Sequence, residues 1–427
     1  MNERLIIFTR YPVPGMTKTR LIPELGPVRA AELHKQITEK TLDTAINAAA
    51  LKGIRPEIHY TGGDLKNMRS WLGSDIPFQE QCQGDIGSRM YNSLIKAFEN
   101  GSRQIILIGT DIPEIMPDHI LSGFDFLSNH DVVLGPSTDG GYWLISLKKP
   151  VNLFSNINWG TGEVLKQTID AAVEKGLSVH LLEPLTDLDQ PKDLKAIALD
   201  KQWKRPYISV VIPALNEEDK IKEVISNARD DEVEVIVIDG GSTDRTKEIA
   251  VETGAKVLNG PCSRATQQNL GAGIATGRIL LFLHADTLLP KDYKICVFRA
   301  LMDTDVKGGA FRFRTDSKKL TVKLVEFCVN LRSRWLNLPY GDQGLFMKKE
   351  LFDFMGGFPA IPIAEDVLLI RRLKRQGSIR IAPSYVVTSA RRWCRLGIFR
   401  TTLINQLILL GLSLKIDPEK LAALYKR

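Results

Sequence analysis

The chain is poor in cysteine, which makes up only five of its 427 residues, at positions 82, 262, 296, 328 and 394. The five lie far apart and no two form a Cys-x-x-Cys motif, which argues against a disulfide framework and a zinc site. Scattered, reduced thiols favour a cytoplasmic protein. The sequence also lacks an apolar run of about 20 residues, and its N-terminal apolar run is too short for a signal peptide. We therefore expect no membrane-spanning segment.

Acidic residues are slightly outnumbered, with 50 Asp and Glu against 57 Lys and Arg, so the net charge is +7. This balance favours anionic partners, such as nucleotide-sugar phosphates or an anionic membrane face. The basic residues are dispersed and there is no zinc-finger pattern, so no nucleic-acid partner is predicted. The length suggests two or three domains, and the composition is typical of a globular protein.

The most informative stretch runs from Arg278 to Pro290. Its continuous apolar run, 279–283, predicts a strand that is buried on both faces. His284, Ala285 and Asp286 follow at its carboxyl end. Ligands of open α/β sheets bind at this end of the strands, where an aspartate can hold a divalent metal ion against a nucleotide diphosphate. The alternative is that Asp286 caps a following helix or turn.

The first half opens with a predicted buried strand, 5–8, followed by a loop that carries Lys18 and Arg20. Two prolines and a glycine shape this loop. Basic side chains and free backbone N–H groups suit phosphate binding, although a solvated basic loop is the alternative. The loop is not a Walker A sequence, so ATPase chemistry is not implied.

A second apolar run, 104–108, is followed by an aspartate, Asp111. It repeats the arrangement around Asp286. Helices are predicted over 27–51 and 86–100 and a strand over 57–60. Glycines after Asp139 allow a ligand to approach the backbone closely. Asp189 precedes a predicted helix, where N-capping is the alternative to a ligand role.

Four segments of the first half carry a family resemblance: GxxKTRL, GTDIP, GPSTDGGYWL and LTDLDQPKDL, spread over about residues 4–195. They resemble a bacterial family of nucleotide-diphosphosugar-transferase-like proteins, the DUF2064 type, which is related to nucleotidyltransferases with a Lys-x-Arg loop. The resemblance implies that Lys18 and Arg20 contact phosphate and that Asp111 and Asp189 hold a metal ion. It leaves the reaction open.

A polar segment, 200–206, lies between apolar stretches and is the predicted linker between a domain at 1–199 and one at 207–427. After it, strands and helices alternate again. This alternation predicts an α/β fold with a mostly parallel sheet that is covered by helices.

The second half contains Ile-Pro-x-x-Asn-Glu at 212–217, Asp-Gly-Gly-Ser-Thr-Asp at 239–244 and Leu-His-Ala-Asp at 283–286. Over residues 207–393 it resembles the family 2 glycosyltransferases, which are inverting enzymes with a GT-A fold. Segments 262–271, 340–346, 364–367 and 389–393 are closest to a bacterial subgroup linked to arsenosugar synthesis, some of whose relatives glucosylate a carotenoid acid. The whole chain then resembles two tandem GT-A-like, Rossmann-like domains.

The second resemblance implies roles for particular residues. Asp286 would hold Mg²⁺ or Mn²⁺, and Asp366 would be the general base, with a pKa raised by its neighbour Glu365. Arg391 and Arg392, beside Trp393, would contact the diphosphate. The nucleotide would be held by Pro213, Asn216, Glu217, Asp239, Gly241, Arg264 and His284.

Alternatives remain for several of these residues. Glu365 or Asp366 could simply begin a helix. Arg391 and Arg392 could be a basic surface pair. Family 2 enzymes commonly have Asp-x-Asp where this chain has His284-Ala285-Asp286, so the nucleotide contact of the first aspartate is in doubt. His284 could replace it through a hydrogen bond, or be a histidine satisfied at a strand end.

Three functions follow. The first is a glycosyltransferase that moves a sugar from a nucleotide-diphosphate donor to a small or lipidic acceptor. The second is a bifunctional enzyme whose first half makes the activated donor. In the third, the first half is a binding module. The apolar tail, 397–416, is expected to be a packed helix; the alternative is an interfacial helix on the cytoplasmic face of a membrane.

Overall fold

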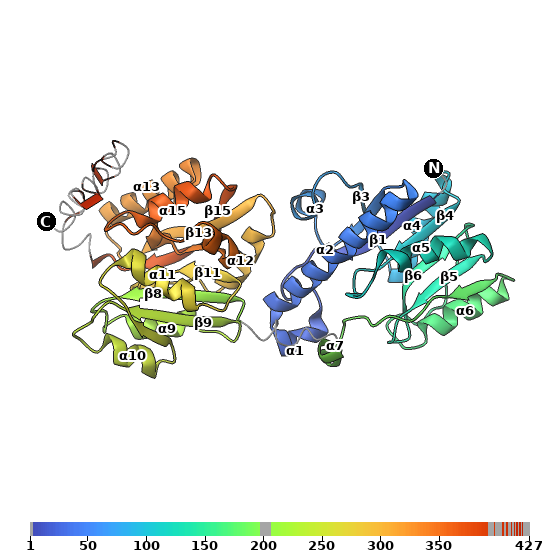
Figure 1. The fold of residues 1–427 in the computed structure, drawn as a ribbon, viewed down its shortest axis with the longest axis horizontal. Helices are drawn as coiled ribbons and strands as arrows, with labels where there is room; N and C mark the ends of the chain where they lie inside the picture. Colours follow the sequence, from blue (N-terminus) through green and yellow to red (C-terminus); the bar gives the residue numbers. More distant parts are fainter. Residues whose placement is uncertain are drawn as a thin grey trace. The chain divides into compact units, whose positions relative to one another are not determined.

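The computed structural model describes residues 3–196 and 206–391, and in the C-terminal tail residues 397, 404, 407–408, 411, 414, 416, 418–419 and 421 (Figure 1). The chain forms two compact units, Met1–Trp203 and Lys204–Arg427. Of the predicted linker 200–206, only Pro206 is described. Within the described part of the chain, no helix has the length and apolar character needed to cross a membrane.

The first unit alternates strands and helices along the chain. Its strands are β1 (Glu3–Arg10), β2 (Pro56–Thr61), β3 (Phe78–Glu80), β4 (Gln104–Ile108), β5 (Val132–Pro136), β6 (Tyr142–Leu147) and β7 (Val179–Leu181). Its helices are α1 (Ile22–Leu25), α2 (Pro27–Lys52), α3 (Leu65–Leu72), α4 (Ile86–Glu99), α5 (Pro117–Asp125), α6 (Val164–Glu174) and α7 (Pro191–Ala196), with short 3₁₀ helices η1 (Thr19–Leu21) and η2 (Phe126–Ser128).

The strands of the first unit form one sheet in the order β3-β2-β1-β4-β6-β5-β7. Only β6 runs antiparallel to its neighbours, β4 and β5. Helices cover both faces. On one face α4 and α6 pack on Ile6, Ile105 and Leu107, and on the other Gly123 of α5 lies against Ile106. The carboxyl ends of β1 and β4 therefore lie side by side, and the loops after them can share a site.

The second unit repeats this alternation. Its strands are β8 (Ile208–Ala214), β9 (Val233–Asp239), β10 (Lys256–Asn259), β11 (Ile279–Phe282), β12 (Thr287–Leu288), β13 (Val306–Thr315), β14 (Leu345–Lys348) and β15 (Ser378–Thr388). Its helices are α9 (Ile221–Ala228), α10 (Thr246–Glu252), α11 (Arg264–Ile274), α12 (Tyr293–Leu301), α13 (Leu320–Leu336), α14 (Lys349–Phe354) and α15 (Glu365–Leu373), with the 3₁₀ helix η3 (Gly341–Gln343).

These strands form a sheet in the order β10-β9-β8-β11-β14-β13-β15-β12. The first four are parallel, whereas β14 pairs antiparallel with β11 and with β13. As its continuous apolar sequence predicts, β11 is completely buried. It packs beneath α11, α14 and α15 through Leu280 and Phe282. Two α/β units with mixed, mostly parallel sheets confirm the predicted fold class.

Candidate functional site

In the second unit, three predicted site residues meet just beyond β11. Arg391 Nη2 lies 2.5 Å from Glu217 Oε2 and 3.5 Å from Asp286 Oδ2. The backbone helps to hold this group, because the N–H of Ser389 donates to the carbonyl oxygen of Asp286. Burial raises the pKa of Glu217, and Arg391 partly offsets that shift. One guanidinium thus bridges two carboxylates at the carboxyl end of the sheet.

The predicted nucleotide-binding residues lie at the ends of β8 and β9. Asp239 is buried, and its Oδ2 accepts hydrogen bonds from the N–H groups of Gly241 and Ser242, each at 3.1 Å. Gly241 has a φ of 92°, a conformation that favours glycine. Asn216 Oδ1 accepts the N–H of Thr243 at 2.8 Å, which ties the two strand ends together.

The second carboxylate oxygen of Asp239 is a candidate ligand contact. Its Oδ1 is buried and has no hydrogen-bond partner among the described residues. A buried carboxylate oxygen is costly without a donor, so this atom is suited to a ligand hydroxyl or N–H group. Pro213 lies in β8 opposite Ile238, and its ring lacks an N–H that a ligand could use.

Asp366 lies in the first turn of α15, as the helix-start alternative predicts, but it also contacts a second segment. Its Oδ1 accepts the N–H of Val367 at 2.8 Å, and its Oδ2 accepts the N–H of Gly341 at 2.6 Å. A Cβ atom on Gly341 would lie 3.2 Å from both Asp366 Oδ2 and His284 Nε2. Asp366 and His284 therefore converge on Gly341.

His284 is partly buried, and its Nε2 atom is fully buried. Burial lowers the pKa of His284 to about 3, and the positive charge of Arg264 lowers it further. Its Nε2 has no partner within the described part of the chain. Arg264 begins α11, and its charge acts on His284, Asp342 and Glu365, which places it beside this group.

Two more carboxyl groups lie near Asp366. Burial raises the pKa of Asp342 to about 6, and the charge of Asp366 adds to that shift against the opposing effect of Arg332. Burial, followed by the charge of Asp366, also raises the pKa of Glu365. Carboxyl groups with raised pKa values, such as those of Asp342 and Glu365, are typical of sites that move protons. Asp342 lies in segment 340–346, which carries part of the family resemblance, but the sequence assigned no role to this residue.

Arg392 and Trp393, also predicted at this site, lie outside the described residues. So does most of the tail 397–416. Its described residues Ile404 and Ile408 pack with Ile363 and Leu421.

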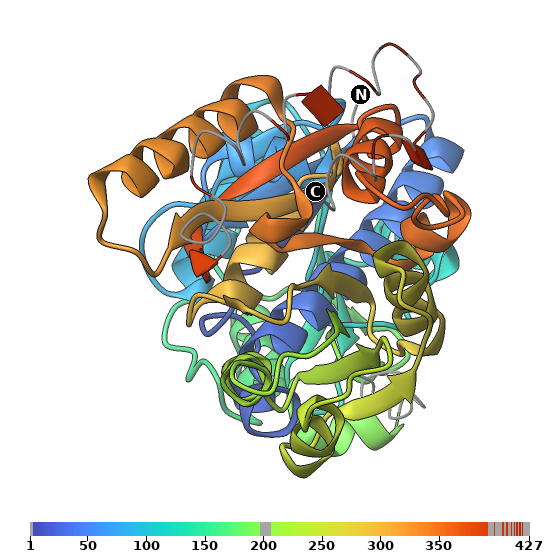
Figure 2. The ribbon, with the colours of Figure 1, turned by 90° about the vertical axis from the view of Figure 1, so that its left-hand side faces the viewer.

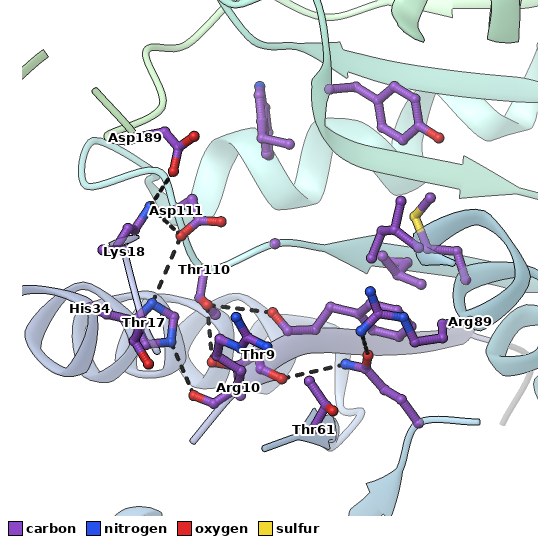
Figure 3. Close-up of a pocket in the computed structure, with 18 of the residues that line it drawn as sticks. Thr9, Arg10, Thr17, Lys18, His34, Thr61, Arg89, Thr110, Asp111 and Asp189 are labelled. Atoms are coloured by element: carbon purple, nitrogen blue, oxygen red, sulfur yellow. Dashed lines mark hydrogen bonds and ion pairs between the residues drawn. The ribbon is translucent and has the colours of Figure 1, made fainter. Parts of the chain in front are cut away.

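The first unit contains a cavity of about 580 Å³ above the ends of β1 and β4 (Figure 3). Lys18 Nζ lies at its edge, 2.6 Å from Asp111 Oδ1 and 3.8 Å from Asp189 Oδ1, and donates to the carbonyl oxygen of Leu188 at 2.5 Å. Arg20 Nη1 lies 2.5 Å from Asp189 Oδ2. The four residues predicted for phosphate and metal binding are thus brought together, although they come from early, middle and late parts of the unit.

His34 lies beside Asp111 and contacts the backbone of β1. Its Nε2 lies 3.0 Å from the carbonyl oxygen of Arg10, which can only accept, so Nε2 carries the proton. Its Nδ1 lies 3.8 Å from Asp111 Oδ1. Burial lowers the pKa of His34 to about 4. Burial raises the pKa of Asp111, but the charges of Lys18 and His34 outweigh it, so the net shift is downward.

Two arginines that the sequence did not reveal line the same cavity. Arg10 Nη1 donates to the carbonyl oxygen of Met16 at 3.3 Å, and Arg89 Nη1 donates to Gln81 Oε1 at 3.1 Å. Burial and then the charge of Arg10 lower the pKa of Arg89. Because Lys18 and Arg20 already face carboxylates, these two guanidinium groups leave the cavity with a surplus of positive charge.

The predicted glycine turn after Asp139 is present, but its glycine serves the protein's own backbone. A Cβ atom on Gly140 would lie 2.2 Å from the carbonyl oxygen of Gly162. The close approach that requires glycine is therefore with the loop before α6.

The described residues contain no group of three or more His, Cys, Asp or Glu side chains placed to hold a metal ion. Mg²⁺ is commonly bound through one or two carboxylates together with substrate phosphates and water. Asp286 and the neighbouring Glu217 fit that pattern in the second unit. Asp111 and Asp189 fit it in the first, where Lys18 now lies between them.

Two family models match the chain. Residues 41–161 match a family described as "Uncharacterized protein conserved in bacteria (DUF2064)", and residues 209–362 match glycosyl transferase family 2. The predicted pairing of these two domains is confirmed.

Curated relatives match short parts of the chain. A 4,4'-diaponeurosporenoate glycosyltransferase of Staphylococcus haemolyticus is 37% identical over 103 residues, covering 21% of this chain and 26% of the relative. A glucosyl-3-phosphoglycerate synthase of Mycobacterium tuberculosis is 34% identical over 122 residues, covering 22% of this chain and 38% of the relative. The chain thus spans well under half the length of these relatives.

Solved structures match parts of the chain. One described as a nucleotide-diphospho-sugar transferase, from Desulfovibrio desulfuricans, is 29% identical, with 47% of this chain and 88% of that chain covered and a TM-score of 0.43. A mannosyltransferase of Pyrobaculum calidifontis in complex with GDP-Man and Mn²⁺ is 22% identical, with 43% and 56% covered and a TM-score of 0.34.

Proposed function

We propose that this chain, which joins a DUF2064 domain to a family 2 glycosyltransferase domain, transfers a sugar from a nucleotide-diphosphate donor to an acceptor hydroxyl with inversion. The observation that carries the proposal is the convergence of Asp366, Gly341 and His284 beside the carboxyl end of β11, close in sequence to Asp286. This arrangement offers a base and a charged leaving-group site on one sheet edge.

Asp366 is proposed as the general base. Each of its carboxylate oxygens accepts one backbone N–H, which orients the group and leaves each oxygen a free lone pair for the acceptor proton. Glu365 is buried beside it, and its raised pKa favours the neutral form there.

The leaving diphosphate is proposed to bind beside Asp286 and Arg391. A guanidinium group can contact two phosphate oxygens at once. To do so, Arg391 exchanges its contact with Glu217 for phosphate. A divalent ion, Mg²⁺ or Mn²⁺, held by Asp286 would neutralise charge on the departing diphosphate.

The nucleoside is proposed to lie over β8 and β9. The unpaired Oδ1 of Asp239 would accept a ribose hydroxyl or base N–H, and Asn216 and Gly241 shape the strand ends beside it. His284, partly buried and neutral, offers its buried Nε2 to a sugar or acceptor hydroxyl at the Asp366 side of the site. With one base and no second nucleophile identified for a covalent intermediate, a single displacement inverts the sugar carbon.

The test uses the full chain with a panel of nucleotide sugars and Mn²⁺. Donor binding is measured by calorimetry, and release of nucleoside diphosphate is followed after cell lipid and metabolite extracts are added as acceptors. The Asp366→Asn variant should bind the donor as the wild type does and release at least 100-fold less diphosphate. The proposal fails if no donor binds, or if the variant retains full turnover.

A second candidate function concerns the first unit. Its cavity gathers Lys18, Arg20, Asp111 and Asp189 with two further arginines, which supports binding of a nucleoside triphosphate or a sugar phosphate. The first unit would then transfer a nucleotidyl group and supply the activated donor. Pyrophosphate release from nucleoside triphosphates and sugar phosphates tests it, with Asp111→Asn as the inactive variant. No pyrophosphate with any common pair would leave the first unit as a binding module.

A further inference from the structure

Helix α13 lies at the surface of the second unit (the long orange helix in Figure 2). It exposes a stripe of large apolar side chains. Leu320, Leu324, Phe327, Leu331 and Trp335 recur every three or four residues, so they lie on one face of the helix, and Leu336 ends the helix beside them. Their exposed fractions are Leu320 86%, Leu324 64%, Phe327 63%, Leu331 43%, Trp335 77% and Leu336 57%. A continuous exposed apolar surface of this kind marks an interaction site.

The opposite face of α13 fixes this orientation. Glu326 is buried and its Oε1 accepts hydrogen bonds from the N–H and hydroxyl of Thr315 at 2.8 and 2.6 Å. Asn330 both donates to and accepts from the backbone of Phe313, each at 2.8 Å. These contacts bind the helix to β13, so it cannot roll to bury its apolar stripe.

The charges around the stripe are basic. Lys318 and Lys319 are exposed just before the helix, and Lys323 and Arg334 lie within it. The single acidic residue of the helix is Glu326, which is buried and paired with Lys323. A face of Leu, Phe and Trp flanked by Lys and Arg is the pattern of helices that lie in the interface of anionic membranes.

The end of α13 leads directly to the proposed base. Ser333 Oγ donates to Gln343 Oε1 at 2.7 Å, and the guanidinium of Arg332 lies 3.4 Å from the ring centre of Tyr340. The next residue after Tyr340 is Gly341, whose N–H contacts Asp366. A surface that receives α13 would therefore lie close to the acceptor side of the site.

We propose that α13 docks the second unit on an anionic lipid bilayer, and that the acceptor hydroxyl belongs to a molecule dissolved in that bilayer. The part of the proposal that concerns the acceptor rests on the proposed glycosyl transfer. The docking itself stands on the stripe and its basic flanks. The described tail residues Ile404, Ile408 and Leu421 pack with Ile363, which does not belong to the stripe.

The test is flotation of the full chain with vesicles of phosphatidylcholine, alone or with 30% phosphatidylglycerol. The wild type should float with the anionic vesicles and be released by high salt, since screening weakens the basic contacts. The double variant L324E/F327E should lose at least ten-fold in bound fraction. The matched control is Val251→Glu, which adds one charge at an exposed apolar position of α10 in the same unit and should bind as the wild type does.

Membrane docking and glycosyl transfer are tested by different measurements. The docking proposal is overturned if the wild type does not float with anionic vesicles, or if the double variant floats with them as well as the wild type does. It is also overturned if light scattering shows a dimer that the double variant dissociates, because a second copy would then cover the stripe. Donor binding with Mn²⁺ is measured on the same samples. If the wild type binds no donor, the proposed glycosyl transfer is refuted, and the docking result still stands.

Discussion

The backbone N–H of Gly341 donates to Asp366 Oδ2 at 2.6 Å, and the same glycine Cα faces His284 Nε2. Glycine is needed here for space and not for its conformational freedom, because Gly341 does not have a positive φ. A side chain at this position would enter between the proposed base and the histidine. The contact therefore couples the loop after α13 to the start of α15.

Gly341→Ala should reduce turnover by about ten-fold or more while donor binding changes little, because a displacement of about 1 Å at the reacting groups costs on this scale. Its Cβ would lie 3.2 Å from both side chains, closer than nearly all such contacts. The measurement is kcat with saturating donor. Gly273→Ala on α11 is the control, since nothing lies within 4 Å of its Cβ. Equal kcat values for the two variants would contradict the coupling.

Arg391→Gln should weaken binding of a nucleoside diphosphate roughly 10- to 100-fold, as expected for the loss of a hydrogen bond between charged groups. It should also raise the pKa of Glu217 further, because Arg391 holds that pKa down against burial. Calorimetric titration with UDP and GDP measures the first effect. Arg380→Gln removes a comparable exposed ion pair, with Asp303 at 2.7 Å, and should leave the affinity unchanged. A loss of affinity in both variants would point to net charge instead of a specific contact.

The raised pKa of Asp342 makes stability depend on pH. The pKa is about 6 in the folded chain and about 3.9 when the chain is unfolded, so folding takes up a proton between these values. The free energy of unfolding should therefore fall as pH rises from about 4 to about 6, relative to the Asp342→Asn variant, which does not titrate there. The expected change is on the order of 2–3 kcal/mol.

Melting curves of wild type and Asp342→Asn at pH 4, 5, 6 and 7 measure this difference. Asp353→Asn is the control, since Asp353 is an exposed partner of Lys349. A difference between wild type and Asp342→Asn that stays constant from pH 4 to 7 would show that Asp342 ionises normally.

The first-unit cavity makes a separate prediction. Arg89→Gln should weaken binding of inorganic pyrophosphate to the full chain about ten-fold, because it removes one of the two guanidinium groups that give the cavity its surplus of positive charge. Arg103→Gln, at an exposed position outside the cavity, is the control. Titration of pyrophosphate without added metal measures both. If the two variants bind alike, Arg89 does not contact the anion.

The sequence predicted the strands that precede Asp111 and Asp286, because a continuous apolar run followed by a carboxylate is a local pattern. The helix predicted over 86–100 was found at Ile86–Glu99, a small error at its carboxyl end. The meeting of Lys18 with Asp189 has no local signal, since those residues are far apart in the chain. Family resemblance, not spacing, indicated it.

The cavity arginines and the exposed stripe of α13 could not be predicted, because they depend on which face each strand or helix turns toward the core. Arg10 ends a strand and Arg89 lies within a helix, and neither belongs to a basic cluster in the sequence. The exposed stripe of α13 depends on the hydrogen bonds of Asn330 and Glu326 to β13, which choose the inward face. The sequence singled out His284, but only the folded structure shows that it lies beside Gly341.

The most direct test of the account is calorimetric titration of UDP and GDP into the full chain and its Asp286→Asn variant, with and without Mn²⁺. Mn²⁺ should increase the affinity of the wild type for at least one of the two nucleotides by roughly ten-fold, about 1.4 kcal/mol, and should not increase the affinity of the variant. An equal gain in the variant would contradict the metal site at Asp286.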